Sequence, residues 1–100
     1  MGDKRMTVRD YRTTTIATIA SGKFLTPHAK VTGKVLKVIS ETDGDIHIRL
    51  SDGTNFIICE IIPELPLPKP RMGKTITIWG IVRYDGEHKW WELHPVIGWQ

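Results

Sequence analysis

Residues 30–50, KVTGKVLKVISETDGDIHIRL, decide the fold of this chain because they contain two strand patterns joined by a turn signal. The first pattern alternates apolar or small residues with polar ones up to Gly33 and Val35, and its apolar phase then shifts to Leu36 and Val38. A glycine or a bulge gives such a shift where a strand bends around the corner of a barrel. We therefore predict a long first strand that bends where its apolar phase shifts to Leu36 and Val38.

The second pattern, residues 45–50, alternates apolar and polar residues at every step, which is the period of a strand with one buried face. Asp43 and Gly44 before it form a pair that is typical of tight hairpin turns. A similar turn signal at residues 51–53 leads into a third apolar segment, residues 54–62. These segments predict three consecutive antiparallel strands.

Residues 63–73, PELPLPKPRMG, hold four prolines within eight residues, which excludes a regular helix and a central strand. We expect a crossing loop there. Residues 74–86 and 89–99 then resemble a fourth and a fifth strand, joined at the turn pair Asp85 and Gly86. This order predicts an all-β, five-stranded Greek-key barrel.

The N-terminal part of the chain lacks strand periodicity. Residues 1–12 are polar and of mixed charge, and we expect a flexible arm. Residues 13–22 fit a short helix, with Thr15 as N-cap and Gly22 as the stop, but the run of threonines equally favours an extended segment. The sequence predicts one domain over residues 13–100.

The composition suits one compact domain with a modest preference for anionic partners. Fourteen Lys and Arg against eleven Asp and Glu give a net charge of +3 over 100 residues. No apolar run of membrane-spanning length and no secretory leader are visible, so we expect a cytoplasmic protein without membrane contact. The single cysteine, Cys59, lies in an apolar run and is expected to be a buried thiol.

Two resemblances point to the OB (oligonucleotide- and oligosaccharide-binding) fold. Residues 17–38, ATIASGKFLTPHAKVTGKVLKV, resemble the entry to this fold in single-stranded-DNA-binding proteins and the replication protein A group, and residues 13–97 can be laid on it. The segments DGD at 43–45, followed by His47, and ELHPV at 92–96 are similar to small OB-like domains without a settled activity. The resemblance implies a ligand strand lying across strands two and three. OB domains commonly carry a helix between strands three and four, where this chain has its proline-rich loop.

The same turn, Asp43 to Asp45, is also similar to the start of the calcium site of the staphylococcal nuclease family. That family adds a basic residue and an Asp-Thr-Pro-Glu segment after the third strand. Here Pro63 and Glu64 match, but Ile61 and Ile62 occupy the two preceding positions. The two aspartates are better explained by the turn, and nuclease activity is not expected.

No pattern of catalytic or metal-ligating residues stands out. The four histidines, His28, His47, His88 and His94, lack the spacing of a metal motif. Neighbouring strands could still bring His47, Glu60 and His94 together, which keeps a metal or acid–base cluster as an alternative. The sequence predicts no enzyme, no metal and no cofactor.

Cations and aromatic residues are interleaved on the predicted binding face, as in proteins that contact phosphates with Lys and Arg while bases stack on rings. We predict single-stranded nucleic acid, DNA rather than RNA, as the partner. A protein-interaction or scaffolding module is the alternative. The candidate nucleic-acid-binding residues are Lys37, His47, Arg49, Phe56, Arg83, Tyr84, His88, Lys89 and Trp90.

The adjacent tryptophans near the C-terminus are expected to point in opposite directions, because side chains alternate along a strand. Trp91 lies two positions before Leu93, so both side chains point to the same side of the strand, and Trp91 is assigned to the core. The Trp90 side chain points to the other side of the strand and is the candidate platform for a stacked base. Trp99 is expected either to close the end of the barrel or to contact a partner.

Overall fold

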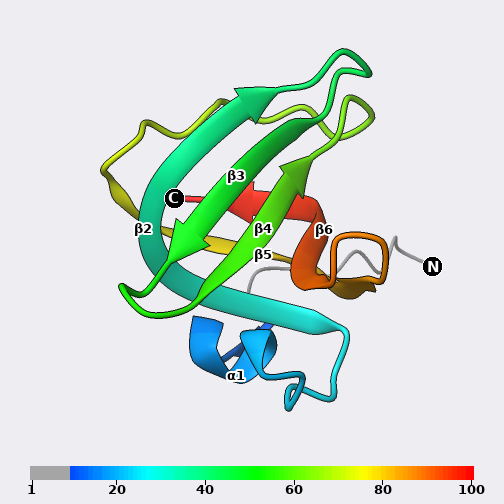
Figure 1. The fold of residues 1–100 in the computed structure, drawn as a ribbon. Coiled ribbons are helices and arrows are strands. Elements are labelled where there is room, and N and C mark those ends of the chain that lie inside the picture. Colours follow the sequence, from blue (N-terminus) through cyan, green and yellow to red (C-terminus); the bar gives the residue numbers. More distant parts are fainter. Residues whose placement is uncertain (1–9) are drawn as a thin grey trace, which may run out of the picture.

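A computed structural model describes residues 10–100 and shows a mostly β chain with one short helix (Figure 1). The five long strands predicted from the sequence are confirmed. The elements in chain order are β1 Arg12–Thr13, α1 Ile16–Ala20, β2 His28–Ser40, β3 Ile46–Ser51, β4 Phe56–Ile61, β5 Thr75–Asp85 and β6 Trp90–Trp99.

The sheet closes into a barrel because β2 pairs with two different strands. Its first half, from His28 to Lys34, is antiparallel to β5, and its second half, from Lys34 to Ser40, is antiparallel to β3. The sheet order is β1-β2-β3-β4-β6-β5, with β4 and β6 parallel. Figure 1 shows β2 bending strongly as it passes from one side of the barrel to the other. The predicted Greek-key barrel is confirmed.

Gly33 lies at the bend of β2 and leaves room for the core. A Cβ at this position would lie 2.9 Å from Leu50 Cγ and 2.9 Å from the Ser51 carbonyl oxygen. The phase shift after Val35 is a bulge, because the pairing register with β3 slips between Val35 and Lys37. Leu36 is the extra residue of this bulge and is 45% exposed.

The barrel is filled by aliphatic side chains from every long strand and from α1. Cys59 is fully buried as a free thiol, as expected, and burial raises the pKa of this thiol. The buried cluster consists of Ile16, Ile19, Ala29, Val31, Val35, Ile48, Leu50, Ile57, Cys59, Ile61, Ile76, Ile78, Leu93 and Val96.

The segment before β2 combines the two alternatives that the sequence allows. Arg12–Thr13 pairs as a short parallel strand with β2, and the helix Ile16–Ala20 follows. Thr15 is its N-cap, since the side chain accepts a hydrogen bond from the Thr18 N–H at 3.1 Å. Packing of Ile16 and Ile19 under the barrel stabilises a helix too short to persist alone. Within residues 10–100, no helix has the length and apolar character needed to cross a bilayer.

The predicted arm, residues 1–12, lies mostly outside the described residues. Its end differs from the prediction, because Tyr11 is buried and meets the His28 ring edge-on at 5.3 Å between centroids. Arg12 already belongs to β1. Regular structure therefore begins before Thr13, the start of the predicted domain.

The proline-rich segment between β4 and β5 is a loop without a helix, as its composition predicts. It is attached to the barrel at two points. The Trp99 indole N–H donates to the Pro68 carbonyl at 2.8 Å, and the Gly73 N–H donates to the Val35 carbonyl at 2.7 Å. Trp99 thus lies at the barrel end beneath this loop.

Gly80 offers a direct test of how closely β5 and β6 pack. A Cβ there would lie 2.5 Å from the Pro95 carbonyl oxygen and 3.1 Å from Val96 Cα, both backbone atoms. We expect Gly80→Ala to lower the free energy of unfolding by about 1–3 kcal/mol in chemical denaturation. Gly86→Ala, whose methyl group would meet only Tyr84 Cε2 at 4.0 Å, is the control. Equal stabilities of the two variants would contradict this packing.

Candidate nucleic-acid interface

One row of paired residues crosses the outer face of the sheet. Lys37 on β2 lies opposite Arg49 on β3, which lies opposite Ile58 on β4. Ile58 in turn lies opposite Glu92 on β6, and Glu92 opposite Arg83 on β5. Residues directly opposite each other project from the same face. The row therefore places cations on either side of a carboxylate that is only 1% exposed.

Four side chains form a continuous second row, which we call the ring row: Arg49, Phe56, Trp90 and His88. The Arg49 guanidinium lies 4.1 Å from the centre of the Phe56 ring. Phe56 meets Trp90 edge-on at 6.1 Å, and His88 stacks on Trp90 at 4.6 Å with an angle of 6° between the planes. The ring row thus places two flat apolar rings between the Arg49 guanidinium and the ionisable His88 imidazole.

Trp90 lies where three surface cavities meet. Their volumes are about 460, 210 and 410 Å³. Every candidate residue except Arg83 lines at least one of them. Phe56, Tyr84, Lys89 and Trp90 line the cavity of 460 Å³. Lys37, His47, Arg49 and Trp90 line the cavity of 210 Å³. His47, His88 and Trp90 line the cavity of 410 Å³.

Arg83 is set apart from the other predicted residues. Its Nε lies 3.7 Å from Glu92 Oε1, and it lines none of the three cavities that contain Trp90. Because it faces a buried carboxylate, its first role is to balance that charge.

The adjacent tryptophans take the two faces that alternation predicts. Trp91 packs against the core and against the Tyr84 ring, 5.1 Å away. Trp90 lies on the outer face, where its indole N–H donates to Glu92 Oε2 at 2.8 Å. Trp90 is nevertheless half-buried, since His88 and Phe56 cover part of it. It belongs to a set of packed rings and is not an isolated platform.

The hairpin turn between β5 and β6 holds His88 over Trp90. Asp85 Oδ1 accepts the backbone N–H groups of Glu87 and His88, and Asp85 Oδ2 lies 2.8 Å from His88 Nδ1. This bond is the main cause that lowers the pKa of Asp85 to about 2 and raises the pKa of His88. Lys89 completes the turn with a left-handed φ of 60°.

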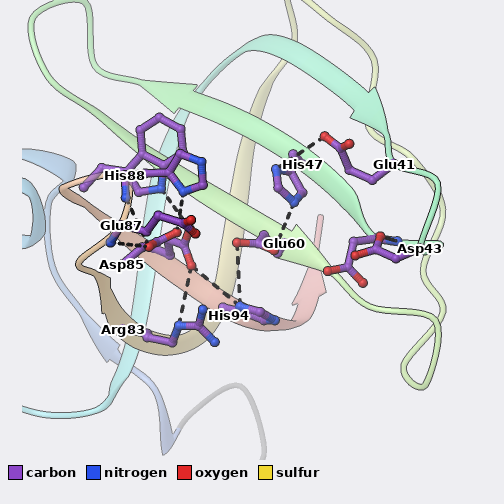
Figure 2. A network of polar contacts seen from close by, with 12 residues as sticks. Glu41, Asp43, His47, Glu60, Arg83, Asp85, Glu87, His88 and His94 are labelled. Atoms are coloured by element: carbon purple, nitrogen blue, oxygen red, sulfur yellow. Dashed lines mark hydrogen bonds and ion pairs between the residues drawn. The ribbon is translucent and has the colours of Figure 1, made fainter.

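A network of carboxylates and histidines lies next to the ring row (Figure 2). His47 Nε2 is 3.1 Å from Glu60 Oε1, and His47 Nδ1 is 3.8 Å from Glu41 Oε1. His94 Nδ1 is 3.6 Å from both Glu60 Oε2 and Glu92 Oε1. The structure therefore brings His47, Glu60 and His94 together, as the alternative interpretation of the sequence allowed.

The pKa of the Glu60 carboxyl is raised to about 8. Burial is the largest cause, and the neighbouring carboxylates of Glu92 and Asp45 add to it. In the folded chain this group therefore holds its proton more tightly than a solvated glutamate does.

Glu92 is the residue of this site that sequence reasoning missed. Glu92 points to the same side of β6 as Trp90 and His94, which is the outer face. From the sequence alone, a charged residue on this face is expected to be exposed. The burial arises because the side chains of Trp90, Arg83 and His94 approach it from β5 and β6. Such covering depends on tertiary contacts that no local pattern encodes.

Comparison with known proteins identifies the fold. No protein-family model and no curated protein sequence matches this chain. Among solved structures, the Entamoeba histolytica asparaginyl-tRNA synthetase superposes with a TM-score of 0.69 and 17% identity over 90% of this chain. The chain adopts the OB fold. An S. pombe Stn1–Ten1 complex superposes with a TM-score of 0.57 and 18% identity over 86% of this chain.

These similarities concern the OB fold and the path of its strands. The chain spans only 23% of the synthetase chain and 73% of the chain matched in the Stn1–Ten1 complex. The resemblance to the OB fold predicted from residues 17–38 is confirmed.

The raised pKa of Glu60 makes stability depend on pH. The folded chain binds this proton more tightly than the unfolded chain, in which the pKa of Glu60 has its ordinary value of 4.5. The protonated carboxyl therefore makes its full contribution to the free energy of unfolding below pH 4.5, and this contribution is lost as the pH rises through about 8. We expect Glu60→Gln to raise the melting temperature relative to wild type at about pH 9, and much less at about pH 5. The measurement is thermal unfolding by circular dichroism in buffer containing a chelator.

The matched control is Glu64→Gln, on the exposed loop after β4. It should leave the melting temperature unchanged at both pH values. A Glu60→Gln variant that is less stable than wild type at high pH would show that the ionised carboxylate stabilises the fold.

Proposed function

We propose that this chain binds single-stranded nucleic acid, DNA in preference to RNA, and catalyses no reaction. The observation that carries the proposal is the ring row, in which Arg49 on β3, Phe56 on β4, Trp90 on β6 and His88 on the β5–β6 turn form a chain of contacts. Single strands are bound by such combinations, because phosphates attract the cations while bases stack on the rings.

The geometry suggests how a strand would lie. Tyr84 is 49% exposed and lines the largest of the three cavities. The His88 imidazole is already parallel to the Trp90 indole, which is the position that a stacked base would take. His88 is itself exposed on a turn, so a base can either displace it or stack on its outer side. Lys37, Arg49 and Lys89 are placed around these rings for phosphate contacts.

A protein partner is the second candidate, and two exposed apolar residues on β2 favour it. Leu36 is 45% exposed at the bulge, and Ile39 is 41% exposed at the edge of two of the cavities. An apolar docking surface would respond weakly to salt, whereas phosphate binding weakens steeply as salt rises.

Replacing the central ring of the ring row tests the stacking proposal. We expect Trp90→Ala to weaken binding of a labelled oligo-dT by roughly 5- to 150-fold in fluorescence anisotropy, the equivalent of about 1–3 kcal/mol per stacked base. Trp90→Phe keeps an aromatic ring and should retain most of the affinity. Trp99→Ala, in a separate cavity, is the control and should bind like wild type. Undiminished binding by a folded Trp90→Ala would rule out stacking at this residue.

Salt dependence tests the phosphate contacts. We expect Arg49→Gln to reduce the slope of log affinity against log salt concentration by about 0.7, the effect of one phosphate contact in a single strand. Arg71→Gln removes the same charge from the proline-rich loop, where Arg71 lines a different cavity with Lys69, Lys74 and Trp99. This control should keep the wild-type slope. If only Arg71→Gln changes the slope, the strand lies on the other side of the barrel.

A further inference from the structure

Three potential metal ligands from different parts of the chain converge beside the ring row. Asp45 immediately precedes β3, Glu60 lies on β4 and His94 lies on β6. One donor atom from each of these side chains lies within 4.8 Å of the other two. Figure 2 shows Glu60 and His94 facing each other between their strands. A single ion could therefore contact all three residues after small side-chain movements.

Two buried atoms at this place lack hydrogen-bond partners. Glu92 Oε1 and His94 Nδ1 are shielded from solvent, and neither has a partner within hydrogen-bonding geometry. They lie 3.6 Å apart, and the Glu92 side chain is only 1% exposed. A buried polar atom without a partner is costly, and an ion or a water molecule commonly satisfies it. His94 belongs to the grouping with Asp45 and Glu60, whereas Glu92 Oε1 lies outside it and supports a bound ligand as a separate observation.

The charge balance favours a cation as this ligand. Asp45, Glu60 and Glu92 bring three carboxyl groups together, and the one permanent cation paired with them is Arg83, which lies 3.7 Å from Glu92, while the ionisable His47 lies 3.1 Å from Glu60 in the described part of the chain. Gathering buried carboxylates is unfavourable unless positive charge accompanies them. A divalent ion would supply that charge.

We propose that Asp45, Glu60 and His94 bind a divalent transition-metal ion of the Zn²⁺ class. One imidazole nitrogen with two carboxylate oxygens suits Zn²⁺ better than Ca²⁺ or Mg²⁺, which prefer sets of oxygen ligands. His94 would coordinate through Nδ1, the nitrogen that faces the carboxylates. Three protein ligands leave a coordination position free for water or another oxygen ligand.

A second group of possible ligands, Asp85, Glu87 and His88, lies on the exposed β5–β6 turn. Here Asp85 already bonds to the His88 ring and to two backbone N–H groups, so an ion would have to replace existing bonds. At Asp45, Glu60 and His94, by contrast, His94 Nδ1 and the adjacent Glu92 Oε1 are buried without hydrogen-bond partners. The first group is therefore the better site, and the turn provides a natural control.

Isothermal titration calorimetry on the full chain, stripped with EDTA and dialysed, tests the proposal directly. We expect ZnCl₂ to bind at one ion per chain and to raise the melting temperature, since a ligand that binds only the folded state stabilises it. CaCl₂ and MgCl₂ should bind at least about tenfold more weakly. Absence of a saturable zinc site would overturn the proposal.

Variants locate the ion. Asp45→Asn and His94→Gln should each weaken zinc binding by at least about tenfold, whereas His88→Gln on the turn should bind like wild type. Asp45→Asn is the decisive variant, because the bonds that hold Asp45 in its turn come from its backbone, whose N–H donates to Asp43 Oδ1 and whose carbonyl accepts from the Glu41 N–H. Zinc binding that survives Asp45→Asn and disappears in His88→Gln would place the ion on the turn. Nitrogen-15 spectra of the imidazoles should show zinc shifting Nδ1 of His94, and an unchanged His94 signal would likewise contradict the site.

Discussion

The structure depends on one strand serving two sides of the barrel. β2 can pair with β5 along its first half and with β3 along its second half because Gly33 lets the core approach the bend and the bulge at Leu36 resets the register. Without that bend the sheet would remain open and β5 would lose a pairing partner. Closure removes exposed sheet edges and fixes which side of each strand faces outward.

Once the barrel is closed, side-chain alternation determines the interface. β3, β4 and β6 each contribute outward residues that meet in the ring row, and the β5–β6 turn adds His88 above Trp90. The same alternation gathers Glu60, Glu92 and His94 beside the rings. The outer face therefore has two parts. One part holds the cations and aromatic rings, and the other holds carboxylates, of which Glu92 has an oxygen without a hydrogen-bond partner. A bound cation at those carboxylates would reduce their repulsion of phosphate, which links the two proposals without making either depend on the other.

Much of the fold and the location of the candidate interface could be predicted from the sequence. Alternation at residues 45–50, the Asp-Gly turns and the proline-rich loop each have a local physical cause. The position of Leu36 could not be predicted, because a phase shift does not reveal which residue becomes the bulge. The burial of Glu92, the separate role of Arg83 and the stacking of His88 on Trp90 arise from tertiary contacts between β5 and β6. The convergence of Asp45, Glu60 and His94 likewise requires knowledge of which strands are neighbours.

The central claim is that an unpaired nucleic-acid strand lies along the face formed by β3, β4 and β6. Amide chemical-shift mapping of the ¹⁵N-labelled chain during titration with oligo-dT tests it most directly. The account predicts saturable shifts concentrated between His47 and Ile58 and between Tyr84 and Glu92. Shifts confined to residues 69–75 and Trp99 would contradict it, as would a spectrum that does not change.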